Sequence, residues 1–122
     1  MGIVEQKLAG NGHAKTVHTY TLPEGIRNGG PTKVGIVQLS ADQELLASKM
    51  GNFNFTKTQY AAVKLSIVSF DGRPVDHDSV ESFFDGADAR IRSLLLQAYN
   101  KMTSPSRDDE DSFFKSEEIQ VG

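Results

Sequence analysis

Few residues in this chain of 122 have the types and spacing that a chemical site needs. The densest group consists of His77, the two aspartates on either side of it, Asp76 and Asp78, and the nearby Glu81. Alternating carboxylates can hold a divalent cation, but a calcium loop needs about five or six oxygen ligands at fixed positions and a glycine at its sixth position. The residues after Asp76 supply neither. We therefore expect a solvated helix-capping cluster, in which Asp78 or Ser79 caps a short helix.

Other kinds of active site are also absent from the pattern. Gly25, Gly29 and Gly30 precede an expected strand, whereas a phosphate loop ends in Gly-Lys-Ser/Thr and opens a helix. No Gly-x-Ser-x-Gly motif ties a serine to one of the three histidines. The chain has no cysteine, which excludes disulfides, zinc-thiolate sites and a thiol nucleophile. We predict no catalytic residue, no metal and no cofactor, so the chain is expected not to be an enzyme.

Two aromatic residues stand out near the C-terminus. Residues 104–122 carry two basic and six acidic side chains, a net charge of −4, yet include Phe113 and Phe114. Disordered tails usually lack aromatics. Two interpretations remain open: a C-terminal helix that packs on its own domain, or a segment, helical over 108–115, that folds on a partner.

Composition predicts one ordinary globular domain. Hydrophobic residues make up 38% of the chain and charged residues 24%, with a net charge of −3. We assign residues 1–14 to a weakly ordered N-terminus, 15–103 to the domain, and 104–122 to an acidic tail that is partly disordered or binds a partner. The acidic balance argues against nucleic acid as a partner. No apolar run approaches the roughly 20 residues of a membrane span, and the first residues do not resemble a secretory signal.

Two strands and several helices are expected to build the domain. Residues 16–22 and 33–39 are rich in β-branched residues and flank a glycine-rich loop, which predicts an antiparallel hairpin. Ser40 and Gln43 form a capping-box pattern for a helix that Gly51 ends. A helix over 57–68, capped by Thr56 or Thr58, is favoured next, although residues 65–70 also alternate as a strand does. Asp71-Gly72 then predicts a turn.

The clearest helix runs from 87 to 102. Its apolar residues recur at helical spacing and should form the centre of the core: Ile91, Leu94, Leu95, Ala98, Tyr99 and Met102. The fold class predicted is therefore α+β, with an N-terminal antiparallel hairpin packed against a small set of helices and an acidic C-terminal tail.

The order of these features resembles the small tail assembly chaperones of tailed bacteriophages and prophages. The resemblance covers residues 16–119 and rests on collinear motifs, none of them specific alone. These are Thr19-Tyr20-Thr21-Leu22-Pro23, the strand 33–39, Ala41-Asp42-Gln43-Glu44-Leu45, Ser69-Phe70-Asp71-Gly72-Arg73-Pro74-Val75, the set Arg92, Leu94, Ala98 and Tyr99, and Phe113-Phe114-Lys115-Ser116. Members often have a tryptophan before the long helix; this chain has none, and Phe83 or Phe84 must stand there.

The resemblance implies a non-enzymatic role in the host bacterial cytoplasm. Such chaperones bind the tape measure protein, keep its apolar helix from aggregating and help to recruit tail tube subunits. Phe113, Phe114 and Ser116 are then the expected partner-binding residues, with no nucleic acid or membrane involved, and with a homo-oligomer possible. The alternative is a structural tail completion or connector protein that is retained in the virion.

Overall fold

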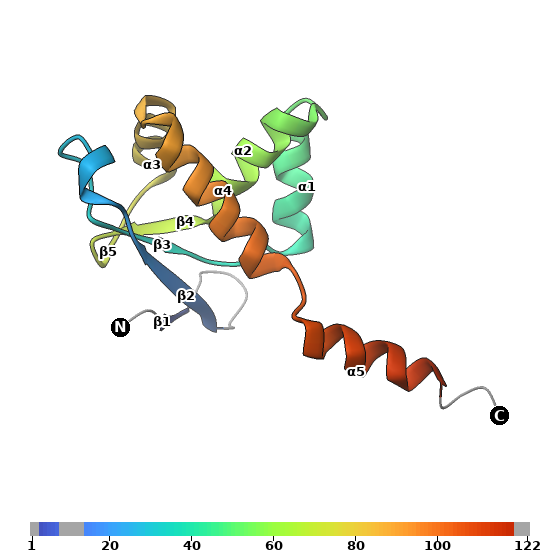
Figure 1. The fold of residues 1–122 in the computed structure, drawn as a ribbon. Helices are drawn as coiled ribbons and strands as arrows, with labels where there is room; N and C mark the ends of the chain where they lie inside the picture. The colour runs from blue at the N-terminus through green and yellow to red at the C-terminus, as the bar shows by residue number, and fades with distance from the viewer. Residues whose placement is uncertain (1–2, 8–13, 119–122) are drawn as a thin grey trace.

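A computed structural model describes residues 3–7 and 14–118 of the chain. Five antiparallel strands form one sheet in the order β1-β2-β3-β4-β5. Figure 1 shows helices α1 to α4 on one side of this sheet and α5 extending away from it. The predicted α+β fold is confirmed.

The sheet begins with the hairpin that the sequence predicts. Strands β2 (Ala14–Thr21) and β3 (Lys33–Ile36) pair antiparallel, with Thr21 opposite Lys33. The connecting loop contains a short 3-10 turn, η1 (Glu24–Ile26). Strand β1 (Ile3–Lys7) pairs along the outer side of β2, so the N-terminal residues assigned no element contribute a strand.

The prediction for residues 57–68 was wrong at its end. The helix stops at Ser66, and residues Ile67–Phe70 form strand β4, which pairs with β3. The alternation of residues 65–70 was therefore the better signal, because Ile67 pairs with Ile36 of the central strand. The predicted turn follows: Asp71 and Gly72 have φ values of 51° and 80° and lead into the two-residue strand β5 (Arg73–Pro74).

The described residues also form five α-helices, and polar side chains fix where most of these begin. They are α1 (Ala41–Met50), α2 (Phe55–Ser66), α3 (His77–Gly86), α4 (Ala89–Thr103) and α5 (Arg107–Glu118). The Ser40–Gln43 capping box is present as predicted. The other two predicted caps were wrong: Asn54, not a threonine, caps α2, and Asp76, not Asp78 or Ser79, caps α3. In both cases the helix starts earlier, because an Asx side chain accepts the N–H three residues on.

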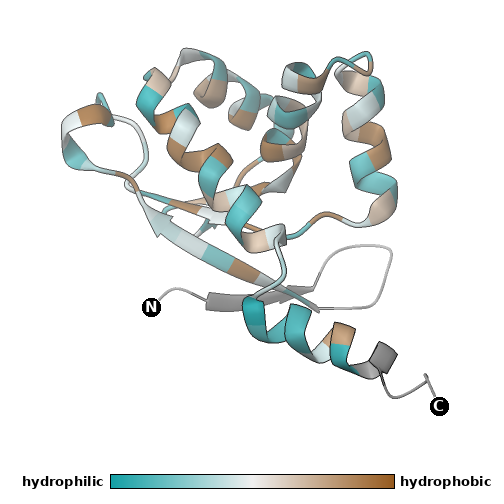
Figure 2. Ribbon diagram, turned by 45° about the vertical axis from the view of Figure 1, so that its right-hand side comes forward, coloured by the Kyte–Doolittle hydropathy of each residue, from teal (hydrophilic) through white to brown (hydrophobic). Residues whose placement is uncertain are grey.

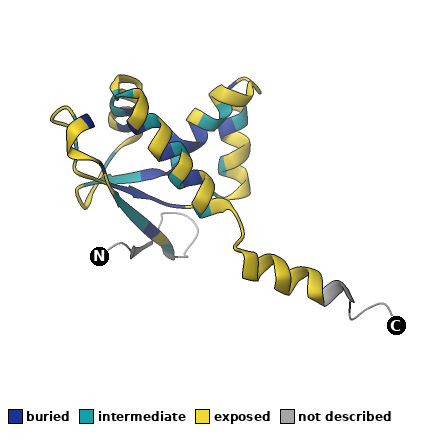
Figure 3. Ribbon diagram, viewed as in Figure 1, coloured by how far each residue is buried: buried dark blue, intermediate teal, exposed yellow. Residues whose placement is uncertain are grey.

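The core lies between the sheet and helices α2, α3 and α4 (Figure 3). Helix α4 contributes buried Ile91, Leu95 and Tyr99, whereas Leu94, also predicted to be buried, is 40% exposed. The buried apolar face of α4 is thus narrower than the sequence predicted. Of the two adjacent phenylalanines in α3, Phe84 is fully buried, and Phe83 is partly buried against the same core.

Candidate partner-binding surfaces

Helix α5 is an arm that leaves the domain at the end of α4. Three residues, Ser104 to Ser106, separate the two helices, and every residue from 103 to 115 is exposed. The Ser106 hydroxyl accepts the N–H of Asp109 at 3.0 Å, and an Asp109 carboxylate oxygen accepts the N–H of Ser106 at 3.0 Å. These hydrogen bonds lower the pKa of Asp109 and fix the start of the helix. This Ser-x-x-Asp box was readable in the sequence but was missed.

The two phenylalanines of the arm pack against each other. Phe113 and Phe114 lie edge to face, with ring centroids 5.1 Å apart, and are 70% and 58% exposed. Of the two interpretations that the sequence left open, packing of this pair on its own domain is therefore wrong. Ser116 lies in the last turns of α5, beyond the part of the helix whose side chains the structure describes, and Ile119 and Val121 lie outside the described residues.

The charge of the arm is concentrated before the aromatic pair. Residues 108–111 are four consecutive acidic side chains, and Arg107 and Lys115 flank them. All six side chains from 107 to 111 and at 115 are exposed. Figure 2 shows the result, a mostly hydrophilic helix with a hydrophobic band toward its end. The arm therefore presents two aromatic rings next to a block of negative charge.

A second exposed apolar surface was not predicted from the sequence. Helices α1 and α2 form a hairpin that buries only Ala47 from α1, and it leaves several large apolar residues exposed. We define the α1–α2 surface as five of these exposed apolar side chains together with two exposed lysines of the hairpin: Leu46, Lys49, Met50, Phe53, Phe55, Lys57 and Tyr60. Phe53, in the loop, and Phe55, the first residue of α2, are 72% and 75% exposed.

The loop between α1 and α2 holds this surface in a defined shape. Asn52 and Phe53 both adopt left-handed backbone conformations, with φ values of 52° and 58°. The N–H of Phe53 donates to the carbonyl of Ser48 at 2.8 Å, and the N–H of Gly51 donates to that of Ala47 at 2.9 Å. A bulky residue in this region is strained by about 1–3 kcal/mol. The turn therefore keeps an exposed aromatic ring at the tip despite that cost.

Next to the loop lies a hollow of about 210 Å³ between α2, α1 and α3. Its lining consists of Met50, Lys57, Tyr60, Ala61, Lys64 and Glu81. Carboxylates compensate the positive charge of Lys64 there, because its Nζ lies 2.8 Å from Asp85 and 3.8 Å from Glu81. Within the described part of the chain, Lys49 and Lys57 have no carboxylate within ion-pair distance. These two lysines give the α1–α2 surface a positive charge.

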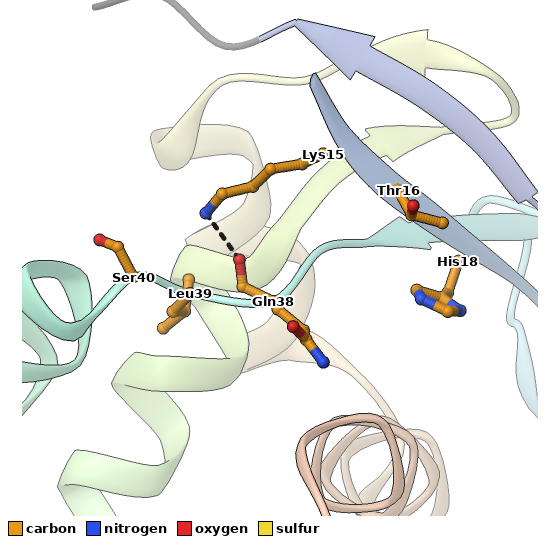
Figure 4. Close-up of a pocket in the computed structure, with 6 residues that line it drawn as sticks. All are labelled: Lys15, Thr16, His18, Gln38, Leu39 and Ser40. Carbon is orange, nitrogen blue, oxygen red and sulfur yellow. Dashed lines mark hydrogen bonds between the residues drawn. The ribbon is translucent and has the colours of Figure 1, made fainter. Parts of the chain in front are cut away.

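Another hollow, of about 470 Å³, lies between β2, the segment that follows β3 and the start of α1 (Figure 4). The Nζ of Lys15 donates to the Gln38 carbonyl at 2.7 Å and to the Gln43 side chain at 3.2 Å. The Gln38 amide donates in turn to the Met102 carbonyl at the end of α4. The hydrogen bonds of Lys15 and Gln38 thus tie the sheet to α1 and α4.

The acidic cluster around His77 is placed at the start of α3. Asp76 accepts the N–H of Ser79 at 2.8 Å, and hydrogen bonds from Ser79 lower its pKa. Among residues 3–7 and 14–118, no group of three or more histidine or acidic side chains is arranged to hold a metal ion. None of the helices in that part of the chain is both long and apolar enough to cross a membrane.

Comparisons of the chain with protein-family models, curated proteins and solved structures found no match.

Proposed function

We propose that this chain is a non-enzymatic tail assembly chaperone of a tailed bacteriophage or prophage, acting in the host bacterial cytoplasm. In this role it binds the tape measure protein and assists assembly of the tail tube. The partner and the pathway come from the resemblance of its motifs to those chaperones. The observation that carries the binding role is the exposed Phe113–Phe114 pair on an acidic arm.

The physical argument concerns temporary cover for an apolar helix. A long helix that has not yet met its final partners exposes an apolar face, which other chains can aggregate on. An amphipathic helix can bind such a face through a few apolar anchors. Because α5 is already helical, docking it costs less ordering than docking a disordered tail. Two phenylalanines contribute a few kcal/mol at most, which suits a contact that must be exchanged later.

The test is co-expression with the tape measure protein of the same phage or prophage. The double variant Phe113→Ala/Phe114→Ala should keep its fold but lose the ability to hold the tape measure protein in the soluble fraction. The matched control is Asp111→Ala/Lys115→Ala, which changes two flanking exposed positions without changing the net charge. Equal solubilisation by wild type and the phenylalanine variant contradicts the proposal.

A second measurement separates the chaperone from the structural alternative. A chaperone leaves before the particle is complete, so mass spectrometry of purified virions should not find this chain at a fixed copy number. A fixed copy number would favour a tail completion or connector protein that remains in the virion.

A further inference from the structure

The arm and the α1–α2 surface carry opposite charges, and both expose aromatic rings. Residues 45–66 contain no acidic residue, and two of their three lysines, Lys49 and Lys57, have no described carboxylate within ion-pair distance, whereas residues 108–111 are all acidic. Each side also exposes aromatic rings: Phe113 and Phe114 on the arm, and Phe53, Phe55 and Tyr60 on the hairpin. An acidic, aromatic helix and a basic, aromatic surface are therefore both present, uncovered, in the same chain.

One chain does not bring these two surfaces together. The Gln38–Met102 hydrogen bond places the end of α4 near the start of α1, so the arm departs from the opposite end of α1 to the Phe53 loop. Figures 1 and 2 both show α5 directed away from the α1–α2 hairpin. Helix α1 has 10 residues, so its two ends lie about 15 Å apart. The arm thus points outward, where a second copy can receive it.

We propose that two copies of this chain associate reciprocally, each seating the Phe113–Phe114 pair of its arm on the α1–α2 surface of the other. One ring enters the hollow beside Met50 and Tyr60. The acidic residues that precede the pair then lie toward Lys49 and Lys57. Because each copy donates one arm and receives one, the interface is isologous and closes as a dimer.

This inference goes beyond the proposed function, because it concerns the purified chain with no other protein present. Both proposals use the Phe113–Phe114 pair, but the dimer also needs the α1–α2 surface, which the proposed function does not require. A chain that stays monomeric yet keeps the tape measure protein soluble contradicts only the dimer, and a chain that dimerises without doing so contradicts only the proposed function.

The first test is sedimentation of the full-length chain over a wide range of protein concentration. The wild type should shift from monomer to dimer as concentration rises. The variant Lys49→Glu/Lys57→Glu should weaken this association roughly tenfold or more, and added salt should weaken that of the wild type. A wild type that stays monomeric at every concentration overturns the proposal.

A charge exchange gives the sharper test. The arm variant Asp108→Lys/Glu110→Lys/Asp111→Lys keeps the capping Asp109 and changes the net charge of residues 108–111 from −4 to +2. It should also fail to self-associate, since it opposes lysines with lysines. A mixture of the two variants should form a heterodimer about as tight as the wild-type dimer, because both contacts are again between opposite charges. Association of either variant alone at wild-type strength, or no gain on mixing, contradicts the reciprocal arrangement.

Further measurements on this chain distinguish two other possible occupants of the α1–α2 surface. If removal of the arm shifts the NMR signals of Lys49 and Lys57 in a chain that stays monomeric, the arm folds back on its own domain. If the full-length chain stays monomeric and the tape measure protein binds it through Lys49 and Lys57, that protein is the occupant. Either result overturns the dimer.

Discussion

Helices α4 and α5 are neighbours in the chain and both carry large apolar residues, yet only α4 is part of the core. In α4 the apolar residues from Ile91 to Met102 recur over about three turns, and Ile91, Leu95 and Tyr99 are buried in the core cluster beside α2. In α5 they are confined to one adjacent pair, preceded by four acidic residues. A repeated stripe can bury enough area to offset the ordering of a helix, whereas a single pair in a charged helix cannot. The Phe113–Phe114 pair of α5 is therefore left exposed and available to bind another molecule.

The largest effect should come from the inner face of α4. Replacing Leu95 with alanine removes a side chain that is 1% exposed and leaves a cavity in the core. We expect a loss of about 2–5 kcal/mol in the free energy of unfolding, measured by urea denaturation. The matched control is Leu94→Ala on the same helix, at a side chain 40% exposed, which should cost far less. Similar costs for the two variants would show that α4 does not pack as described.

A glycine in the central strand provides the next test of the domain. A Cβ on Gly35 would lie 2.9 Å from a methyl carbon of Val17 and closer still to the Ser69 hydroxyl. Gly35→Ala should therefore lower the free energy of unfolding by about 1–3 kcal/mol. Adding Ser69→Gly should restore part of the loss, since it removes the tighter of the two contacts. An unchanged urea midpoint for Gly35→Ala would mean that the strands pair differently.

Much of this fold was predictable, because local signals agreed with the tertiary contacts. The β2–β3 hairpin, the Ser40 capping box and the Asp71-Gly72 turn each follow from residues within a few positions of one another. The end of α2 did not follow in this way. Residues 65–70 suit both a helix and a strand, and pairing with β3, some thirty residues earlier, decides between them. Such distant pairing is not visible in a local pattern.

The two candidate binding surfaces also differ in whether the sequence predicted them. Phe113 and Phe114 were identified because aromatic residues are unexpected in a segment of net charge −4. The α1–α2 surface was missed because Leu46, Met50 and Tyr60 occur at ordinary helical spacing, which normally indicates a core face. Their exposure depends on α1 packing mainly beside α2, at the margin of the helical layer (Figure 1). Composition identifies an apolar residue in unusual surroundings, but it does not show which side of a helix is left uncovered.

Asp88 caps the start of α4, and acid titration of its carboxylate should have a smaller effect on stability. Hydrogen bonds from the Arg90 guanidinium and backbone N–H hold the pKa of Asp88 at about 2. A lowered pKa in the folded state contributes stability above the ordinary value of 3.8, and this contribution is lost as pH falls toward 2. The melting temperature of the wild type should therefore exceed that of Asp88→Asn most clearly above pH 4, with the gap closing toward pH 2. A gap that is constant with pH would contradict this role of the carboxylate.

The smallest effect on stability should come from the arm. The double variant Phe113→Ala/Phe114→Ala removes two large side chains, but both are mostly exposed, and they contact each other. At low protein concentration, where the chain is monomeric, its free energy of unfolding should stay within about 0.5 kcal/mol of the wild type. At high concentration the wild type alone should melt at a higher temperature, because association of folded chains stabilises them by mass action. A stability loss that is equal at both concentrations would place the phenylalanine pair in the domain's own core, and the contrast between α4 and α5 would no longer hold.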